Sequence, residues 1–285
     1  MPIFASPSSA RSRWRRLADH ETFIMEWGRP EAPPVVCWHA LARTGRDFDP
    51  LAAVLAQAGY RVIVPDTIGR GLSAWARHEE EYGFATYEAI AEALINQPGC
   101  DQVRWIGTSM GGALGVRLAA GRLKNRITHL LVNDIGPELP AAAVDRIEGY
   151  VGRPPVFDGV RGLEAYLREV YVPFGPQTDE QWARMTASSV RRLPNGQVTL
   201  HYDPRVVAQF SRHPHDYTIW DRWDAVRCRT LLLRGASSDL LTEDIAAQML
   251  RRGPRPRLIV DPECGHAPAL NRPFHFGLVL EFLAS

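Results

Sequence analysis

Hydrophobic and polar positions follow two alternating patterns along the N-terminal half of the chain. Short β-branched or aromatic runs, each bounded by Gly, Pro or Asp, predict strands at residues 22–27, 35–38, 61–65, 103–107 and 129–134. Between them, apolar positions at helical spacing predict helices at residues 48–58, 87–95 and 110–120. Strand runs such as VVCW and VIVP are apolar throughout, which is typical of strands covered on both faces. The pattern therefore predicts an α/β fold with a mostly parallel central sheet and helices on both faces.

The same alternation returns near the C-terminus, with strands expected at 230–234 and 257–260 and helices at 243–250 and 274–283. The segment between the two blocks has helical patterns at 141–150, 163–171 and 180–192 and no convincing parallel strand. A structureless connection of that length is improbable inside a compact domain. We therefore expect a core formed by residues 1–136 and 216–285, with residues 137–215 inserted as a helical lid. Pro-rich junctions at 136–137 and 212–214 mark its expected edges.

Composition narrows the classes of partner. The chain has 285 residues, 45% of them hydrophobic and 23% charged, which is typical of a folded globular protein. Its 33 Lys and Arg against 32 Asp and Glu give a net charge of +1, so no overall field attracts nucleic acid or an anionic membrane. We expect a small-molecule partner, no nucleic acid and no membrane, and the sequence leaves the oligomeric state open.

Targeting and cofactor signals are absent from the sequence. The first twenty residues contain no apolar core of a signal peptide, and no run approaches the roughly 18 apolar residues that span a bilayer, so we expect a cytoplasmic protein. Four scattered cysteines form neither a disulfide framework nor a zinc motif. Because no nucleotide-binding glycine motif occurs either, we expect no metal and no organic cofactor.

The segment Gly107-Thr108-Ser109-Met110-Gly111 has the form G-x-S-x-G and lies between a predicted strand and a predicted helix. A serine hydroxyl is a weak nucleophile, and a sharp turn exposes it to both a base and a substrate carbonyl. Glycines on either side leave room for that turn, and the following helix directs backbone N–H groups at the site where negative charge develops. We interpret Ser109 as a nucleophile.

With this turn, three further segments make the sequence similar to the α/β-hydrolase superfamily. They are P-D-x-x-G-x-G-x-S at residues 65–73, Cys37-Trp38-His39-Ala40-Leu41, and Cys264-Gly265-His266-Ala267-Pro268. The resemblance covers nearly the whole chain except the lid, and Ser-Met-Gly-Gly is also similar to bacterial enol-lactone and carbon–carbon hydrolases. It implies the α/β-hydrolase fold, a mostly parallel sheet with helices on both faces and an inserted lid.

The resemblance also implies a triad in the chain order serine, acid, histidine. His266 is the expected general base, since a neutral imidazole can take the serine proton and return it to the leaving group. We expect Asp239, which follows the strand at 230–234, to orient it. Asp134, at the end of the strand after the nucleophile helix, is the alternative acid.

The oxyanion hole is expected to use the backbone N–H of Met110 and, by resemblance, that of Leu41. Here the sequence departs from the family's usual His-Gly pair and has His39-Ala40 instead. If a left-handed conformation is needed at this position, Ala has an energetic cost that Gly avoids. We interpret His39 as structural, holding the loop through a hydrogen bond.

These residues predict a serine hydrolase that cleaves a small carboxylic ester or a lactone through an acyl-enzyme. A carbon–carbon bond hydrolase or an acyltransferase with the same triad is the alternative, since the nucleophile turn does not distinguish these reactions. A non-catalytic small-molecule binding module is the alternative from another class.

Overall fold

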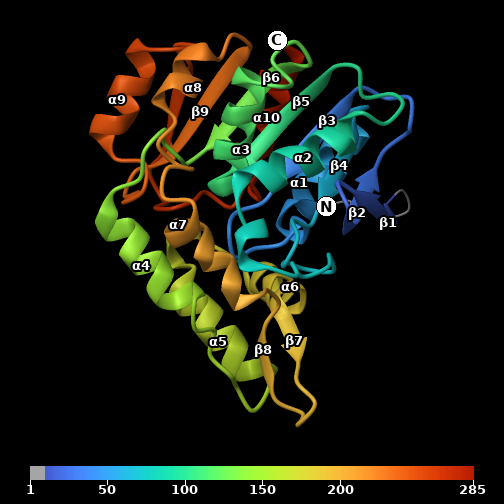
Figure 1. The fold of residues 1–285 in the computed structure, drawn as a ribbon, viewed down its shortest axis with the longest axis vertical. Helices are drawn as coiled ribbons and strands as arrows, with labels where there is room; N and C mark the ends of the chain where they lie inside the picture. Colours follow the sequence, from blue (N-terminus) through green and yellow to red (C-terminus); the bar gives the residue numbers. More distant parts are fainter. Residues whose placement is uncertain (1–9) are drawn as a thin grey trace.

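A computed structural model describes residues 10–285 (Figure 1). Within them an eight-stranded sheet has the order β1-β2-β4-β3-β5-β6-β9-β10. Strands β1, β2 and β4 pair antiparallel, and all the remaining pairs are parallel. The strands are β1 (Arg11–Leu17), β2 (His20–Trp27), β3 (Pro34–Trp38), β4 (Arg61–Pro65), β5 (Val103–Thr108), β6 (Ile127–Asn133), β9 (Arg229–Gly235) and β10 (Arg257–Asp261). The predicted α/β fold with its mostly parallel sheet is confirmed.

All seven predicted strands are present, and the sequence missed only β1 of this sheet. Its residues RSRWRRL are mostly exposed and only Leu17 is buried. An edge strand of this kind has no buried face to produce an apolar pattern, so its strand character comes from pairing with β2. The first nine residues, part of the segment in which we expected no signal peptide, lie outside the described range.

Helices cover both faces of the sheet because successive strand residues point to opposite sides. In β3, Val35 and Cys37 pack in one apolar cluster while Val36 and Trp38 pack in the other. The first cluster includes residues of α1 and α10, and the second includes residues of α2, α3 and α9. The bounds are α1 (Asp49–Gln57), α2 (Phe84–Ile95), α3 (Met110–Ala120), α8 (Trp220–Ala225), α9 (Glu243–Arg251) and α10 (Pro273–Ala284).

The segment between β6 and β9 leaves the sheet, and Figure 1 shows its elements together beyond one end of the strands. It contains α4 (Ala141–Val151), α5 (Val160–Val170), α6 (Asp179–Ser189), the short hairpin β7 (Val190–Arg192) and β8 (Val198–Leu200), and α7 (Ala208–Arg212). All of them fall inside the predicted lid, residues 137–215. The division of the chain into a lid, residues 137–215, and a hydrolase core stays a prediction.

The hairpin of β7 and β8 corrects one part of the expected helical lid. The predicted helix at 180–192 ends at Ser189, and residues 190–192 form β7 instead. The cause is the turn that follows, in which Gly196 has a φ of +86° and Leu193 N–H donates to the Gln197 carbonyl at 2.8 Å. A turn of that geometry pairs the flanking residues as strands.

Residues 10–285, the described part of the chain, lack two kinds of feature. No helix in this range combines the length and apolar character needed to cross a membrane. No cluster of three or more His, Cys, Asp or Glu side chains in the same range is arranged to hold a metal ion.

Candidate active site

Ser109 lies at the sharp turn between β5 and α3, with a φ of +51° and a ψ of −117°. This conformation is sparsely populated for a residue with a side chain and is tolerated where the surroundings enforce it. The two glycines of the motif allow it by close packing. A Cβ added to Gly107 would lie 2.1 Å from the Gly111 carbonyl oxygen, and one added to Gly111 would lie 2.1 Å from the Trp38 carbonyl oxygen. The G-x-S-x-G pattern is thus required by the local geometry.

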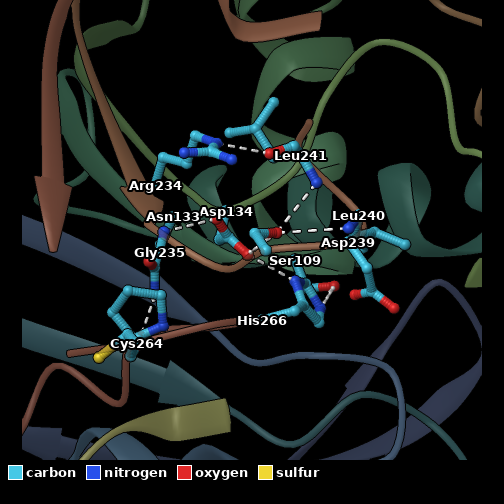
Figure 2. A network of polar contacts seen from close by, with 12 residues as sticks. Ser109, Asn133, Asp134, Arg234, Gly235, Asp239, Leu240, Leu241, Cys264 and His266 are labelled. Atoms are coloured by element: carbon cyan, nitrogen blue, oxygen red, sulfur yellow. Dashed lines mark hydrogen bonds and ion pairs between the residues drawn. The ribbon is translucent and has the colours of Figure 1, made fainter. Parts of the chain in front are cut away.

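Three side chains form a hydrogen-bonded relay at this turn (Figure 2). His266 Nε2 lies 3.0 Å from Ser109 Oγ, and His266 Nδ1 lies 2.8 Å from Asp134 Oδ2. With a proton on Nδ1 donated to the carboxylate, Nε2 is free to accept the serine proton. The relay has the arrangement that activates a serine hydroxyl.

Asp134 is fully buried and accepts two hydrogen bonds besides that of His266. Gly235 N–H donates to Oδ1 at 2.9 Å, and the Ser238 hydroxyl donates to Oδ2 at 2.7 Å. Donors of this kind stabilise the ionised form of a carboxylate that has no contact with solvent. The sequence pattern did not single out Ser238, because a serine in a loop has no signal that separates it from its neighbours.

Asp239, our preferred acid, does not contact His266, and this preference is corrected to Asp134. The Asp239 side chain is 51% exposed, and it forms an ion pair with Arg146 of α4, with N···O distances of 2.8 and 3.0 Å. Figure 2 draws no contact between Asp239 and His266. The physical reason is local. Ser238 faces the buried carboxylate of Asp134, and the next residue points to the surface.

The loop that carries His266 is held by polar contacts behind it. Asp261 ends β10, accepts a hydrogen bond from Arg272 and lies 2.8 Å from Nε2 of the buried His275. Although burial alone raises the pKa of Asp261, these and neighbouring hydrogen bonds lower it to about 2, so the carboxylate is ionised at neutral pH. The Cys264 thiol also donates to Asp261, at 3.2 Å. Asp261 therefore has a structural position in the loop and no contact with the relay.

His39 is buried, and burial lowers its pKa to about 3, so its ring is neutral. Its Nε2 accepts a hydrogen bond from Thr67 N–H at 2.9 Å, which leaves the proton on Nδ1, and Nδ1 donates to the Ala40 carbonyl at 2.7 Å. Within one planar peptide the C=O of Ala40 and the N–H of Leu41 point in opposite directions. His39 thereby fixes the direction of the Leu41 N–H. Ala40 does not adopt a positive φ, so the cost anticipated for Ala in place of Gly does not arise.

A cavity lies beside the relay, between the core and the lid segment. Its lining includes Thr108, Ala40 and Ala267, the chain neighbours of Ser109, Leu41 and His266. The lid segment contributes Phe174, Gln181, Arg184, Met185 and Ser188, and the loop after β3 contributes Arg43, Arg46, Asp47 and Phe48. The cavity therefore combines apolar walls with three arginines and one acidic residue, Asp47, which pairs with Arg43.

Comparison with known proteins finds relatives over nearly the whole chain. The model of the alpha/beta hydrolase family matches residues 35–276. The 3-hydroxybutyrate-oligomer hydrolase of Cupriavidus necator is 36% identical over 92% of each chain. An esterase of Mycobacterium tuberculosis is 25% identical over 87% of this chain and 81% of its own. The crystal structure of an alpha/beta hydrolase from Novosphingobium aromaticivorans has a TM-score of 0.84 at 31% identity, and covers 97% of this chain and 98% of its own.

Proposed function

Since this chain belongs to the alpha/beta hydrolase family and is a hydrolase of ester bonds, we propose that its substrates are short oligomers of an aliphatic hydroxy acid. We further propose that Ser109, His266 and Asp134 carry out the hydrolysis. The observation that supports this role is the hydrogen-bonded relay, with distances of 3.0 and 2.8 Å on the two sides of the imidazole.

The proposed reaction has two steps, the acylation of Ser109 and the hydrolysis of the acyl-enzyme. His266 Nε2 takes the proton of Ser109 Oγ as that oxygen bonds to the ester carbonyl carbon, and the carbonyl oxygen becomes an oxyanion held by the N–H groups of Met110 and Leu41. When the C–O bond to the alcohol breaks, His266 returns the proton to the leaving oxygen, and an acyl-enzyme remains. Water then repeats the sequence, with His266 taking its proton, and releases the acid and Ser109.

The cavity beside the relay supports the choice of substrate. An oligomer of a hydroxy acid has an aliphatic body and one terminal carboxylate, which suit apolar walls with cations among them. Arg184 is 39% exposed, and its partner Glu180 is 71% exposed at 3.2 Å, so this ion pair is weak and the guanidinium can exchange partners. The relative from Cupriavidus necator is named for hydrolysis of 3-hydroxybutyrate oligomers.

The test uses the linear trimer of 3-hydroxybutyrate with wild type and Ser109→Ala, following acid release by titration and products by chromatography. We expect turnover by wild type and a loss of at least about 10⁵-fold in Ser109→Ala. A fluorophosphonate probe should label wild type at Ser109 and fail to label the variant. Faster cleavage of a lactone or of a vinylogous diketone would move the assignment to those bonds, and absence of labelling in folded protein would favour a binding module.

The terminal carboxylate is tested with the same trimer as free acid and as methyl ester. We expect KM to rise about tenfold for the methyl ester with wild type, and this difference to shrink in Arg184→Gln. Equal KM values for the two forms would remove carboxylate recognition from the proposal and leave the ester hydrolysis in place. The cytoplasmic location expected from the sequence is part of the proposal, and activity measured in cell fractions would check it.

A further inference from the structure

Arg70 lies on the turn after β4 and is fully buried. Among residues 10–285 no carboxylate forms an ion pair or a hydrogen bond with its guanidinium. Asp203 is linked to Arg70 only indirectly, because it accepts from Tyr82 OH at 2.6 Å and the Tyr82 ring faces the guanidinium; its own cationic partner is Arg205. Burial of a cation without a counter-charge is costly.

The guanidinium contacts both residues of the oxyanion hole. Its Nε donates to the Leu41 carbonyl at 2.7 Å, and its Nη2 donates to the Met110 thioether sulfur at 3.6 Å. Nη1 donates to the Ile68 carbonyl and to Tyr87 OH, each at 2.8 Å. Arg70 therefore links the loop after β3, which carries one N–H donor, to the start of α3, which carries the other.

The two peptides that flank Leu41 are fixed from different sides. His39 holds the Ala40 carbonyl at 2.7 Å, and Arg70 holds the Leu41 carbonyl at 2.7 Å. Tyr82 and Tyr87 face the guanidinium with ring centroids 5.6 and 5.3 Å from its central carbon. Aromatic faces stabilise a cation but supply no full negative charge. The arrangement keeps a positive charge in place behind the oxyanion hole.

We propose that Arg70 is a positioning residue of the oxyanion hole, and that the anion which balances its charge is the oxyanion of the transition state. This inference rests on the proposed ester hydrolysis. Because Arg70 is fully buried and contacts both segments that carry the N–H donors, its fixed charge should stabilise the anionic transition state more than the neutral substrate. Arg70 should therefore affect kcat and leave KM nearly unchanged.

The experiment compares Arg70→Lys, Arg70→Gln and Arg70→Met with wild type. It measures kcat and KM on 4-nitrophenyl butyrate and the inhibition constant of phenylboronic acid, which forms an anionic tetrahedral adduct with an activated serine. We expect kcat to fall about 30- to 100-fold in the Gln and Met variants and about tenfold in the Lys variant, with KM within about threefold. The inhibition constant of the boronic acid should rise in proportion to the loss of kcat.

The matched control is Arg61→Met. Arg61 is also buried, but it pairs with Glu26 at 3.0 Å and begins β4, at the strand end opposite to the turn with Arg70. We expect its melting temperature to fall while kcat and boronic acid inhibition stay within about twofold of wild type. Melting temperatures and fluorophosphonate titration of all variants normalise each rate to folded, labelled protein.

The possible results separate the two proposals. An Arg70→Met variant that is folded and has the wild-type kcat would overturn the inference and leave the ester hydrolysis standing. A rise of KM at constant kcat would also overturn it, because Arg70 would then act on substrate binding. If Arg70→Met does not fold, the milder Arg70→Lys decides, since its kcat and boronic acid inhibition must fall together. Wild type without hydrolysis or boronic acid binding would remove the proposed function itself.

Discussion

The ends of β6 and β9 lie side by side in the sheet, and each is followed by an aspartate, yet only one of them reaches His266. The strands pair in parallel, with Asn133 opposite Leu233. Asp134 follows Asn133 directly and is fully buried, with three hydrogen-bond donors on its carboxylate. Asp239 follows Gly235 after three further residues, and its side chain pairs with Arg146 at the surface.

A position in a strand-end loop is therefore not sufficient for the role of the acid. A carboxylate that orients an imidazole must be held by donors and shielded from water, so that its negative charge acts on the histidine alone. The β9 loop supplies one of these donors, the Ser238 hydroxyl, at 2.7 Å from Asp134. The loop after β6 thus supplies the charged carboxylate of Asp134, and the loop after β9 supplies a hydrogen bond that holds this carboxylate.

The largest effect is expected when each aspartate is neutralised in turn. Asp134→Asn should lower kcat by about 10³- to 10⁴-fold, because an amide in place of the carboxylate favours the wrong tautomer of His266 and does not stabilise its protonated form. Asp239→Asn should stay within about twofold of wild type, since it removes only a surface ion pair. Steady-state rates on a 4-nitrophenyl ester measure both.

Each rate is referred to the fraction of folded protein, measured by circular dichroism. The comparison is wrong if Asp239→Asn loses as much activity as Asp134→Asn. Equal losses would mean that the loop after β9 moves during turnover and brings Asp239 to His266.

The sequence was informative where a residue type and its local context are enough. The strand and helix pattern predicted the sheet, G-x-S-x-G predicted the turn at Ser109, and both candidate aspartates could be named. The choice between Asp134 and Asp239 depends on which side chain turns inward after its strand. That direction is set by contacts between residues far apart in the sequence. Gly235 and Ser238 contact Asp134 from 101 and 104 positions away, and Arg146 contacts Asp239 from 93 positions away.

Arg70 shows the same limit in another form. It belongs to a segment that the sequence did single out, P-D-x-x-G-x-G-x-S, but at a variable position of that pattern. The role proposed for Arg70 depends on contacts with Leu41 and Met110, which lie 29 and 40 residues away along the chain. Strand β1 was missed for a related reason, because its pairing with β2 and not its own side chains makes it a strand.

His39, which follows the end of β3, should make the stability of the fold depend on pH. The buried His39 has a pKa of about 3 in the folded protein, below the ordinary value of about 6.5, so the unfolded chain binds a proton first as the pH falls. The contribution to the free energy of unfolding is therefore complete above about pH 6.5 and is lost as the pH falls toward 3. Between pH 7.5 and pH 5 the expected loss is about 2 kcal/mol.

Urea unfolding of wild type and His39→Gln at the two pH values isolates this group, since all other titrating groups are shared. The difference in unfolding free energy between the two proteins should shrink by about 2 kcal/mol from pH 7.5 to pH 5. A difference that is the same at both values would show that His39 does not remain neutral in the folded state.

A smaller effect is expected from the bond that joins the two strand ends. Ser238→Ala removes one of three donors to the buried carboxylate of Asp134, and the loss of a hydrogen bond to a charged group costs about 1.5 to 3 kcal/mol where it is not replaced. Because Gly235 N–H and His266 remain, we expect kcat to fall about tenfold. Ser237→Ala is the matched control, since its hydroxyl contacts the Cys264 carbonyl and not Asp134. An unchanged kcat in Ser238→Ala would mean that the two loops do not cooperate.

The smallest effect belongs to the surface partner of Asp239. Arg146 and Asp239 are 45% and 51% exposed, and an ion pair with that much solvent around it contributes about 0 to 1 kcal/mol to stability. Arg146→Ala should therefore lower the free energy of unfolding by less than about 1 kcal/mol at 0.1 M salt, and the difference should fade at 1 M salt. Since this pair joins α4 to the loop after β9, KM for the 3-hydroxybutyrate trimer is measured on the same variant. A change of KM together with unchanged stability would show that the ion pair positions α4 over the substrate. Asp239 would then contribute to substrate binding, although it does not contact His266.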